Sequence, residues 1–287
     1  MNIFLQISTK SSVVRLKGRN TFAYMKNFGL IMLLAVAGVV NNALGQVNTE
    51  KFRKYSDQEG FVFNTSFRFG LSQGNSEYLS VDGTLRLDYN GKRNNAFIVG
   101  NYDYKETNEG KVANKGFIHL RVVHPVNKRM AVEGFLQQEF NEFLLLRDRK
   151  LVGGSLRTKI MDFASENDSL TNFSSNLGLG LMYEHEVYDV YNEKDLIITS
   201  NLVRMTSYLT LDWNISSRIN WWAVAYYQPN VKSLNDFRGI AETGMEICVL
   251  GRLYFTVDVS YRYNNQPIGD VKHYDLMVKN GLRYSVP

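Results

Sequence analysis

The feature that most constrains this chain is an alternation of apolar and polar residues with a period of two. It runs through LYFTVDVSYRY (residues 253–263), YLSVDGTLRLDY (78–89) and LVRMTSYLTLDW (202–213). In the first stretch, for example, Phe255 falls on the apolar set and Asp258 on the polar set. Successive side chains of a β-strand point to opposite faces. Each stretch therefore predicts a strand with one apolar and one polar face.

The length of these patterns indicates where such strands lie. They persist for about 10 to 13 residues, whereas strands in soluble sheets usually have about 5 to 6 and tilted membrane strands need about 10. Only helices and closed barrels satisfy every backbone hydrogen bond in hydrocarbon, and no helical pattern follows residue 45. We predict an all-β fold: a single transmembrane, antiparallel, up-and-down β-barrel. A soluble antiparallel sandwich also alternates, but it explains the strand length poorly.

The connections between the patterns favour the same fold. Short, polar turns (YNGKRNN, HPVNKRM, NISSRIN, VLGRLY) alternate with mostly longer segments such as KETNEGKVANK, NEFLLLRDRK and QPNVKSLNDF. Outer-membrane barrels have short turns on the periplasmic side and longer loops outside. Counting the hairpins predicts about twelve strands, an even number. The long segment MDFASENDSLTN, around residues 161–172, departs from this rule.

The start of the chain has the composition of a secretory signal. Lys26 precedes the apolar core FGLIMLLAVAGVV, and small residues around Gly45 predict cleavage before Gln46. An uncleaved anchor is the alternative, although the apolar run is short for a membrane-spanning helix. We therefore expect an outer-membrane protein of a bacterium with two membranes, a Gram-negative organism. The expected division is a mis-assigned upstream extension (1–24), a signal peptide (25–45), a short periplasmic segment (46–60) and the barrel (61–287).

The net charge of +5 belongs to the leader. Residues 1–45 contain five basic residues and no acidic one, so of the 33 Lys and Arg 28 remain, against 28 Asp and Glu. Because the rest of the chain is formally neutral, a nucleic-acid partner is not expected.

The predicted inward face carries charges of both signs. Such charges could pair and seal the interior, because an unpaired buried charge is costly, or they could line a water-filled path. We interpret the interior as mostly closed by paired charges, with Glu133, Glu139, Glu242 and Glu246 as companions. The predicted lumen-lining residues are Arg86, Asp88, Arg204, Asp212, Arg252, Asp258, Arg262, Asp275, Lys279 and Arg283.

The sequence offers no catalytic, metal-binding or cofactor-binding motif. None of the four histidines (His119, His124, His185 and His273) has a serine two residues away, and no metal-ligand spacing or phosphate loop occurs. We expect His119 and His273 to be polar residues of the interior, and we expect no enzyme and no cofactor. The role predicted is structural or that of a narrow pore for small solutes or ions.

Two other functions remain open at this level. One is a membrane-embedded hydrolase of lipid or lipopolysaccharide, which would depend on His119 or His273. The other is a surface-binding protein that acts through the connection near Tyr188, Tyr191 and Asp195.

The run LSQGNSEYLSVDGTLRLDYNGKRNNAFIVGNYDY, followed by VNKRMAVEGFLQQEF and the terminal alternating strand, resembles domain-of-unknown-function family 481. This family is also labelled salt-induced outer-membrane proteins. The likeness runs from Phe61 to Val286 and is carried by the turn at Gly74, the hairpin after it and the strand entry at Lys128. It implies an outer-membrane barrel with no established activity. Its partners would be outer-membrane lipid and, during insertion, the barrel-assembly machinery, although Pro287 stands where a terminal aromatic residue is usual.

Overall fold

The computed structural model describes residues 59–74, 77–164, 172–190 and 196–284, which belong to one compact unit within residues 42–287. The predicted upstream extension, the signal peptide with its cleavage site, and nearly all of the predicted periplasmic segment lie outside the described residues. The first strand begins at Gly60, one residue before the expected start of the barrel.

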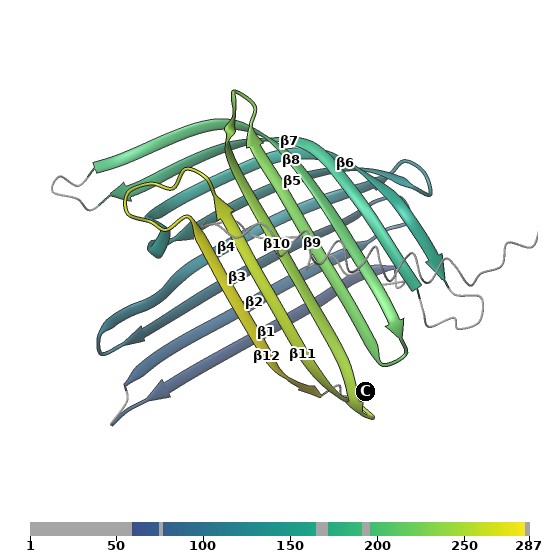
Figure 1. Cartoon of the computed structure of the whole chain (residues 1–287), viewed down its shortest axis with the longest axis horizontal. Coiled ribbons are helices and arrows are strands. Elements are labelled where there is room, and N and C mark those ends of the chain that lie inside the picture. Colours follow the sequence, from purple (N-terminus) through teal and green to yellow (C-terminus); the bar gives the residue numbers. More distant parts are fainter. Residues whose placement is uncertain (1–58, 75–76, 165–171, 191–195, 285–287) are drawn as a thin grey trace, which may run out of the picture. The chain divides into compact units, whose positions relative to one another are not determined.

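Twelve antiparallel strands follow one another along the described part of the chain, and this confirms the predicted all-β, up-and-down barrel fold with about twelve strands (Figure 1). Among the described residues, no helix has the length and the apolar character needed to span a membrane. The strands are β1 (Gly60–Ser72), β2 (Tyr78–Asn90), β3 (Asn95–Thr107), β4 (Gly110–Pro125), β5 (Met130–Asn141), β6 (Leu146–Ala164), β7 (Asn172–Val190), β8 (Leu196–Ser216), β9 (Ile219–Asn230), β10 (Ser233–Leu250), β11 (Leu253–Asn264) and β12 (Tyr274–Tyr284).

Each strand pairs with the next one in the sequence, so the sheet order is the chain order from β1 to β12. The sheet curls round, with β1 to β5 behind β9 to β12 in Figure 1. Strands β1 and β12 are its first and last members, and no ladder joins them within the part of the chain that the structure describes.

Several segments that the sequence predicts as long connections are strand instead. Their strands extend to a tight turn: β3 ends at Thr107 and β4 begins at Gly110, while β9 ends at Asn230 and β10 begins at Ser233. The backbone φ of Gly110 is 118°, a value that glycine adopts readily, which permits the first of these turns. Strand lengths consequently range from 11 residues in β12 to 21 in β8.

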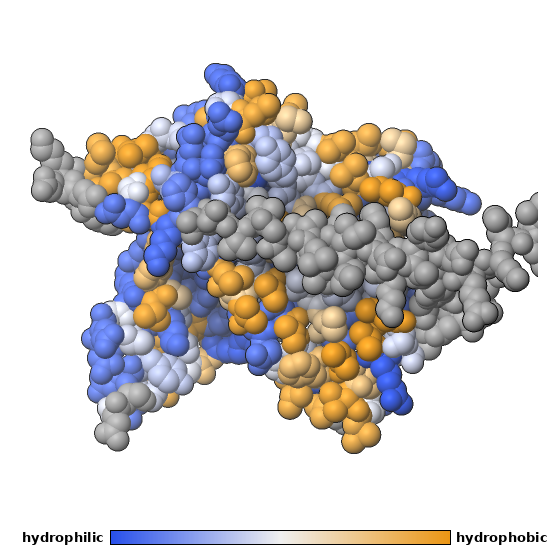
Figure 2. Space-filling view, in the orientation of Figure 1, coloured by the Kyte–Doolittle hydropathy of each residue, from blue (hydrophilic) through white to orange (hydrophobic). Residues whose placement is uncertain are grey.

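The outer surface of the curled sheet is apolar. Leu136 pairs with Val152, Val152 with Tyr183, and Tyr183 with Val203, so one row of apolar side chains crosses β5 to β8. These side chains keep exposed fractions of 52%, 49%, 45% and 43%, respectively. Figure 2 shows apolar patches on the visible face. An uninterrupted apolar row that is exposed across four strands is typical of a surface that another apolar phase covers.

The inner surface is filled unevenly. Tyr208, Val224, Tyr226 and Ile240 form a small buried core on β8 to β10. The ring of Tyr208 lies directly against Gly178, where any Cβ would collide with it, so glycine at this position lets the ring lie flat on the wall. Large inward side chains therefore lie along the sheet on the β7 to β10 side of the interior.

The connection between β11 and β12 reaches the ends of strands that are distant in the sheet order. A Cβ added at Gly269 would lie 3.5 Å from Leu145 Cδ1 and 4.0 Å from Val190 Cγ1, so the tip of this connection rests on the ends of the β5–β6 and β7–β8 hairpins. Its base is held to β10, where the Asn265 backbone N–H donates to the Phe237 carbonyl at 3.0 Å. The connection therefore lies over the end of the interior where the β5–β6 and β7–β8 hairpins turn.

Candidate functional site

Seven buried charged side chains form a network in the interior. The interior charge network consists of Glu139, Arg149, Glu184, Glu186, Arg204, Asp236 and Arg238. They lie near the ends of β5, β7 and the beginnings of β6, β8 and β10, on the same side as the β11–β12 connection. Two strands, β8 and β9, lie between β7 and β10 in the sheet order, so the network reaches across part of the interior.

Glu184 and Arg149 stand at the centre of the network. Arg149 donates from Nη1 to Glu139 Oε1 at 2.6 Å, and also contacts Glu184 and Glu186. Glu184 accepts from Arg204 Nε at 2.9 Å. The exposed fraction is 0% for both Glu184 and Arg149. Because each carboxylate faces at least one guanidinium, the network offsets much of the cost of burying its charges.

Three further contacts hold the network to β10. Arg238 donates from Nη1 to Glu186 Oε1 at 2.6 Å and from Nη2 to the hydroxyl of Tyr188 at 3.3 Å. Arg204 Nη2 lies 3.0 Å from Asp236 Oδ1. Side chains from five strands therefore meet here, and they fill the part of the interior that β5 to β8 and β10 surround.

The register explains why these side chains meet. Glu139 pairs with Arg149 and Arg149 with Glu186, so residues of opposite charge stand side by side on one face of β5, β6 and β7. Glu184 points to the same face, two residues before Glu186, because side chains alternate along a strand.

A second cluster lies on the inward faces of β4, β5 and β8. Arg121 Nη1 and the hydroxyl of Tyr208 both donate to Glu133 Oε2, each at 3.0 Å. His119 Nδ1 lies 2.9 Å from Gln137 Oε1, and Arg121 Nε donates to His119 Nε2 at 3.3 Å. His119 is buried on the inward face, as the sequence predicts, and both ring nitrogens face amide or guanidinium groups.

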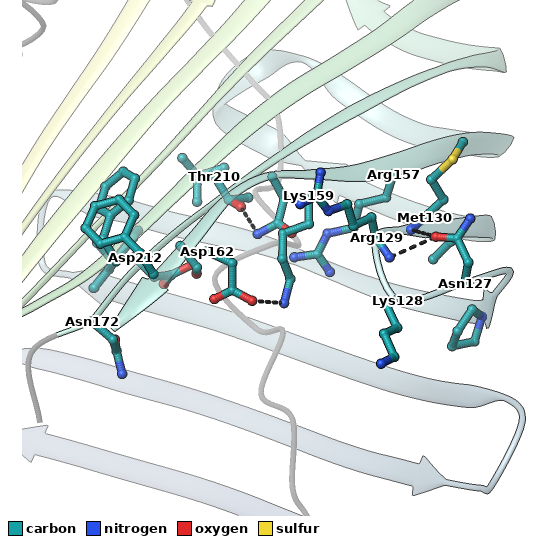
Figure 3. A pocket seen from close by; sticks show the side chains of 18 of the residues that line it. Asn127, Lys128, Arg129, Met130, Arg157, Lys159, Asp162, Asn172, Thr210 and Asp212 are labelled. Carbon is teal, nitrogen blue, oxygen red and sulfur yellow. Dashed lines mark hydrogen bonds and ion pairs between the residues drawn. The ribbon is translucent and has the colours of Figure 1, made fainter. Parts of the chain in front are cut away.

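The interior widens towards the opposite end, at the short turns. There a cavity of about 860 Å³ opens between the β4–β5 turn and the inward faces of β6 to β10 (Figure 3). Its wall includes Lys159, which donates to Asp162 at 2.6 Å, and Asn176, which donates to Thr210 at 3.1 Å. The interior is thus open at one end and filled by charged groups at the other.

Three of the predicted lumen-lining residues are buried. Arg86 Nε donates to Asp88 Oδ2 at 2.6 Å, and the Arg86 guanidinium lies 4.7 Å from the centre of the Phe97 ring. Arg204 belongs to the interior charge network. These side chains pair with neighbours, as expected of a sealed interior, but they lie on strands far apart in the sheet.

The other inward residues lie closer to solvent. Asp212 lines the cavity, Arg262 lies 3.6 Å from Glu242, and Arg283 lies 2.9 Å from Glu246. Asp258, Asp275 and Lys279 are exposed, and the register places all three on the same face as Ser260 and Glu242. Glu242 is buried and Glu246 half-buried on this face, where the sequence places both as companions.

The prediction that Arg252 lines the lumen is wrong. Arg252 lies exposed in the turn between β10 and β11, because β11 begins only at Leu253, and so it is no part of the inward face. The period-two pattern extends one residue beyond the strand, and this explains the error.

The sequence reasoning missed most of the interior charge network. Arg149, Glu184, Glu186, Asp236 and Arg238 fall in or beside segments that were interpreted as connections. The available signal was the alternation in YEHEVY, which places Glu184, Glu186 and Tyr188 on one face. It was weak because the opposite face of this segment also carries a polar residue, His185.

The surface connection proposed for binding is only partly described. Tyr188 is buried and its hydroxyl accepts from Arg238, whereas Tyr191 and Asp195 lie outside the described residues. His273, expected in the interior, lies instead in the β11–β12 connection, where its Nδ1 is 3.2 Å from the Asn264 carbonyl. Among the described residues, no group of three or more His, Cys, Asp or Glu side chains could hold a metal ion.

The fold and the interior define a class: all-β, antiparallel up-and-down barrels with an apolar outer surface and a charged inner one. Within it, the chain belongs to the family described as "Protein of unknown function, DUF481", which matches residues 66–286. This confirms the family that the first hairpin and the terminal strand resemble. No curated protein matches the chain.

Two solved structures share part of the arrangement. A NanC porin is 10% identical, with a TM-score of 0.42, and the match covers 79% of this chain and 99% of that chain. The β domain of the Bordetella autotransporter BrkA is 12% identical, with a TM-score of 0.33, and the match covers 79% of this chain and 98% of that chain. At these scores and identities, the likenesses carry no functional information.

Proposed function

We propose that the protein is an outer-membrane β-barrel that forms a narrow conduit for small solutes and ions, with no catalytic role. In this proposal, lipid covers the outer surface, and the barrel-assembly machinery inserts the chain after a signal peptide has delivered it. The observation that carries the proposal is the opposition of the two faces, with exposed apolar rows outside and charged side chains inside.

The outer surface supports the membrane location. Lys and Arg on the lipid face of a barrel are destabilising, whereas Leu, Val and Phe are favourable there. On β1, four phenylalanine side chains are more than 60% exposed: Phe61, Phe63, Phe67 and Phe69. Soluble monomeric proteins rarely expose a contiguous apolar patch of this kind to water.

The inner surface supports a narrow path. The interior charge network fills the half of the interior formed by β5 to β8 and β10. On β11 and β12, in contrast, Asp258 and its cross-strand partner Lys279 remain exposed on the inward face. Charged side chains along a water-filled path set ion selectivity. Passage is therefore proposed along β11 and β12, beside the filled half.

Conductance of the refolded protein in a planar bilayer tests this proposal. We expect small, stable current steps, and Asp258→Lys should shift the reversal potential in a salt gradient towards anion preference. The matched control is Asp148→Lys, which makes the same change of charge on the outward face of β6. Silence from a folded barrel would contradict the conduit and leave a purely structural role.

The absence of catalysis is also proposed and can be tested. The two ring nitrogens of His119 face Gln137 and Arg121. We expect the refolded protein to leave a lipid analogue intact. Hydrolysis that disappears in His119→Ala would instead support the membrane hydrolase.

A further inference from the structure

The cavity at the short-turn end contains a flat aromatic surface. Trp222 pairs with Gly244 on β10, and a Cβ added at Gly244 would lie 2.5 Å from the indole Nε1 and 2.6 Å from Cε2. The indole therefore lies over the glycine, against the wall, and it also lines the cavity. Glycine permits this contact, because the same Cβ would also lie 2.6 Å from Asp258 Oδ1, and a larger residue would displace the ring, the carboxylate or both.

Polar groups surround this aromatic surface. Asp212 is the cross-strand neighbour of Trp222 on β8, and Asn220 lies two residues before Trp222 on the same face. Thr210, labelled in Figure 3, and Asn176 are joined by a hydrogen bond and also line the cavity. Amide, hydroxyl and carboxylate groups together supply both donors and acceptors around the ring.

The charges of the cavity nearly cancel. Its lining contains four basic side chains, Lys128, Arg129, Arg157 and Lys159, and three acidic ones, Asp162, Asp212 and Glu246. A cation would meet the basic groups and an anion the acidic ones, so neither is favoured by the field of the cavity as a whole. A neutral solute with many hydroxyl groups meets no such conflict.

We propose that this cavity binds a neutral carbohydrate, with a sugar ring stacked on Trp222. The C–H face of a sugar ring is apolar and suits the indole, while its hydroxyl groups suit the surrounding amides and carboxylates. A cavity of about 860 Å³ has the size of known small-molecule sites. This inference rests on the proposed conduit, since it names the class of solute that would enter it.

Isothermal titration calorimetry with the neutral trisaccharide maltotriose tests the inference. The refolded full barrel is used in micelles of a detergent without a sugar headgroup. We expect saturable binding, at least tenfold weaker in Trp222→Ala and nearly retained in Trp222→Phe, which keeps a flat ring. Gly244→Val should weaken binding similarly by displacing the indole.

The matched control is Gly281→Ala. Gly281 is also inward and lies near the short-turn end, but a Cβ there would meet only Thr256 Oγ1, at 4.0 Å. It should therefore leave maltotriose binding unchanged. Folding of each variant is checked by its heat-modifiable migration on a detergent gel.

The inference would be overturned if maltotriose did not bind, or if the wild type and Trp222→Ala bound it equally. Tighter binding of choline or citrate than of maltotriose would likewise overturn it, because the cavity would then select a charged solute. Binding in micelles is independent of current in bilayers. Current without maltotriose binding would refute this inference alone, whereas binding without current would support the site and refute the conduit.

Discussion

Glu184 is the residue on which the interior charge network converges. It accepts from Arg149 and Arg204 and lies 3.1 Å from Arg238 Nη1, and none of its surface is exposed. Removing a single carboxylate would leave three guanidinium groups short of a partner in a buried place. The network is thus sensitive at this residue, although a buried ion pair is weak evidence for overall stability.

Glu184→Ala is expected to lower the free energy of unfolding by about 3 to 5 kcal/mol, the typical cost of breaking a buried ion pair. Urea unfolding of the barrel in lipid vesicles measures the change. The control is Asp148→Asn, whose partner Lys150 lies 3.0 Å away and is exposed, so that a loss of about 0 to 1 kcal/mol is expected. Equal effects of the two substitutions would refute a special role for the buried network.

At this scale, the sequence predicts which face a residue occupies better than it predicts its partner. Arg86, Asp88 and Arg204 share the inward face because alternation alone determines the side of a strand. The contact between Arg204 and Asp236 depends on how the sheet curls, which alternation does not encode. For Arg252 even the face was predicted wrongly, because alternation does not show at which residue a strand begins.

Strand β7 shows how one element serves both surfaces. Leu177, Leu179 and Leu181 face outwards, while Glu184 and Glu186 face the interior nearer its end. A single register of β7 both exposes these leucines on the outer surface and buries the two carboxylates in the network. A slip by one residue would exchange the two faces, so the register is strongly specified.

Leu181→Arg tests the outward face of β7. Leu181 lies near the middle of the strand and is 54% exposed. In a bilayer, an arginine there should cost about 2 to 4 kcal/mol, and about 0 to 1 kcal/mol near an interface. The control is Ile197→Arg, at the start of β8, with a similar exposed fraction of 56%. Unfolding in vesicles measures both, and equal small costs would argue against a membrane-embedded β7.

Element boundaries are less predictable than element type. Long alternation identifies strands, and the number of hairpins was predicted correctly. The ends of β3, β4, β9 and β10 were not, because polar residues on both faces are typical of connections as well as of strands that extend beyond hydrocarbon. The connection at Glu142 illustrates a further local effect: hydrogen bonds from Asn114 and Lys111 lower the pKa of its carboxyl, and sequence spacing does not indicate them.

The whole molecule joins an apolar exterior to an interior that differs from end to end. The end at the β5–β6 and β7–β8 hairpins is occupied by the interior charge network and overlaid by the β11–β12 connection. The opposite end, at the β4–β5 turn, contains the cavity. The sequence predicts the two faces but not this asymmetry, because it arises from contacts between strands that are distant in the chain. A conduit with one filled end would pass only small solutes, at a low rate.

The opposition of the two faces is tested most directly by a spin-label scan of β11. Single cysteines replace residues 255 to 260 one at a time, in a background where the lone Cys248 is serine. At Phe255, Val257 and Val259 we expect frequent collisions with oxygen, which concentrates in lipid. At Thr256, Asp258 and Ser260 we expect collisions with a water-soluble nickel chelate. A period of two in both signals, in opposite phase, is the predicted result; low oxygen accessibility at all six positions would contradict a lipid-facing barrel.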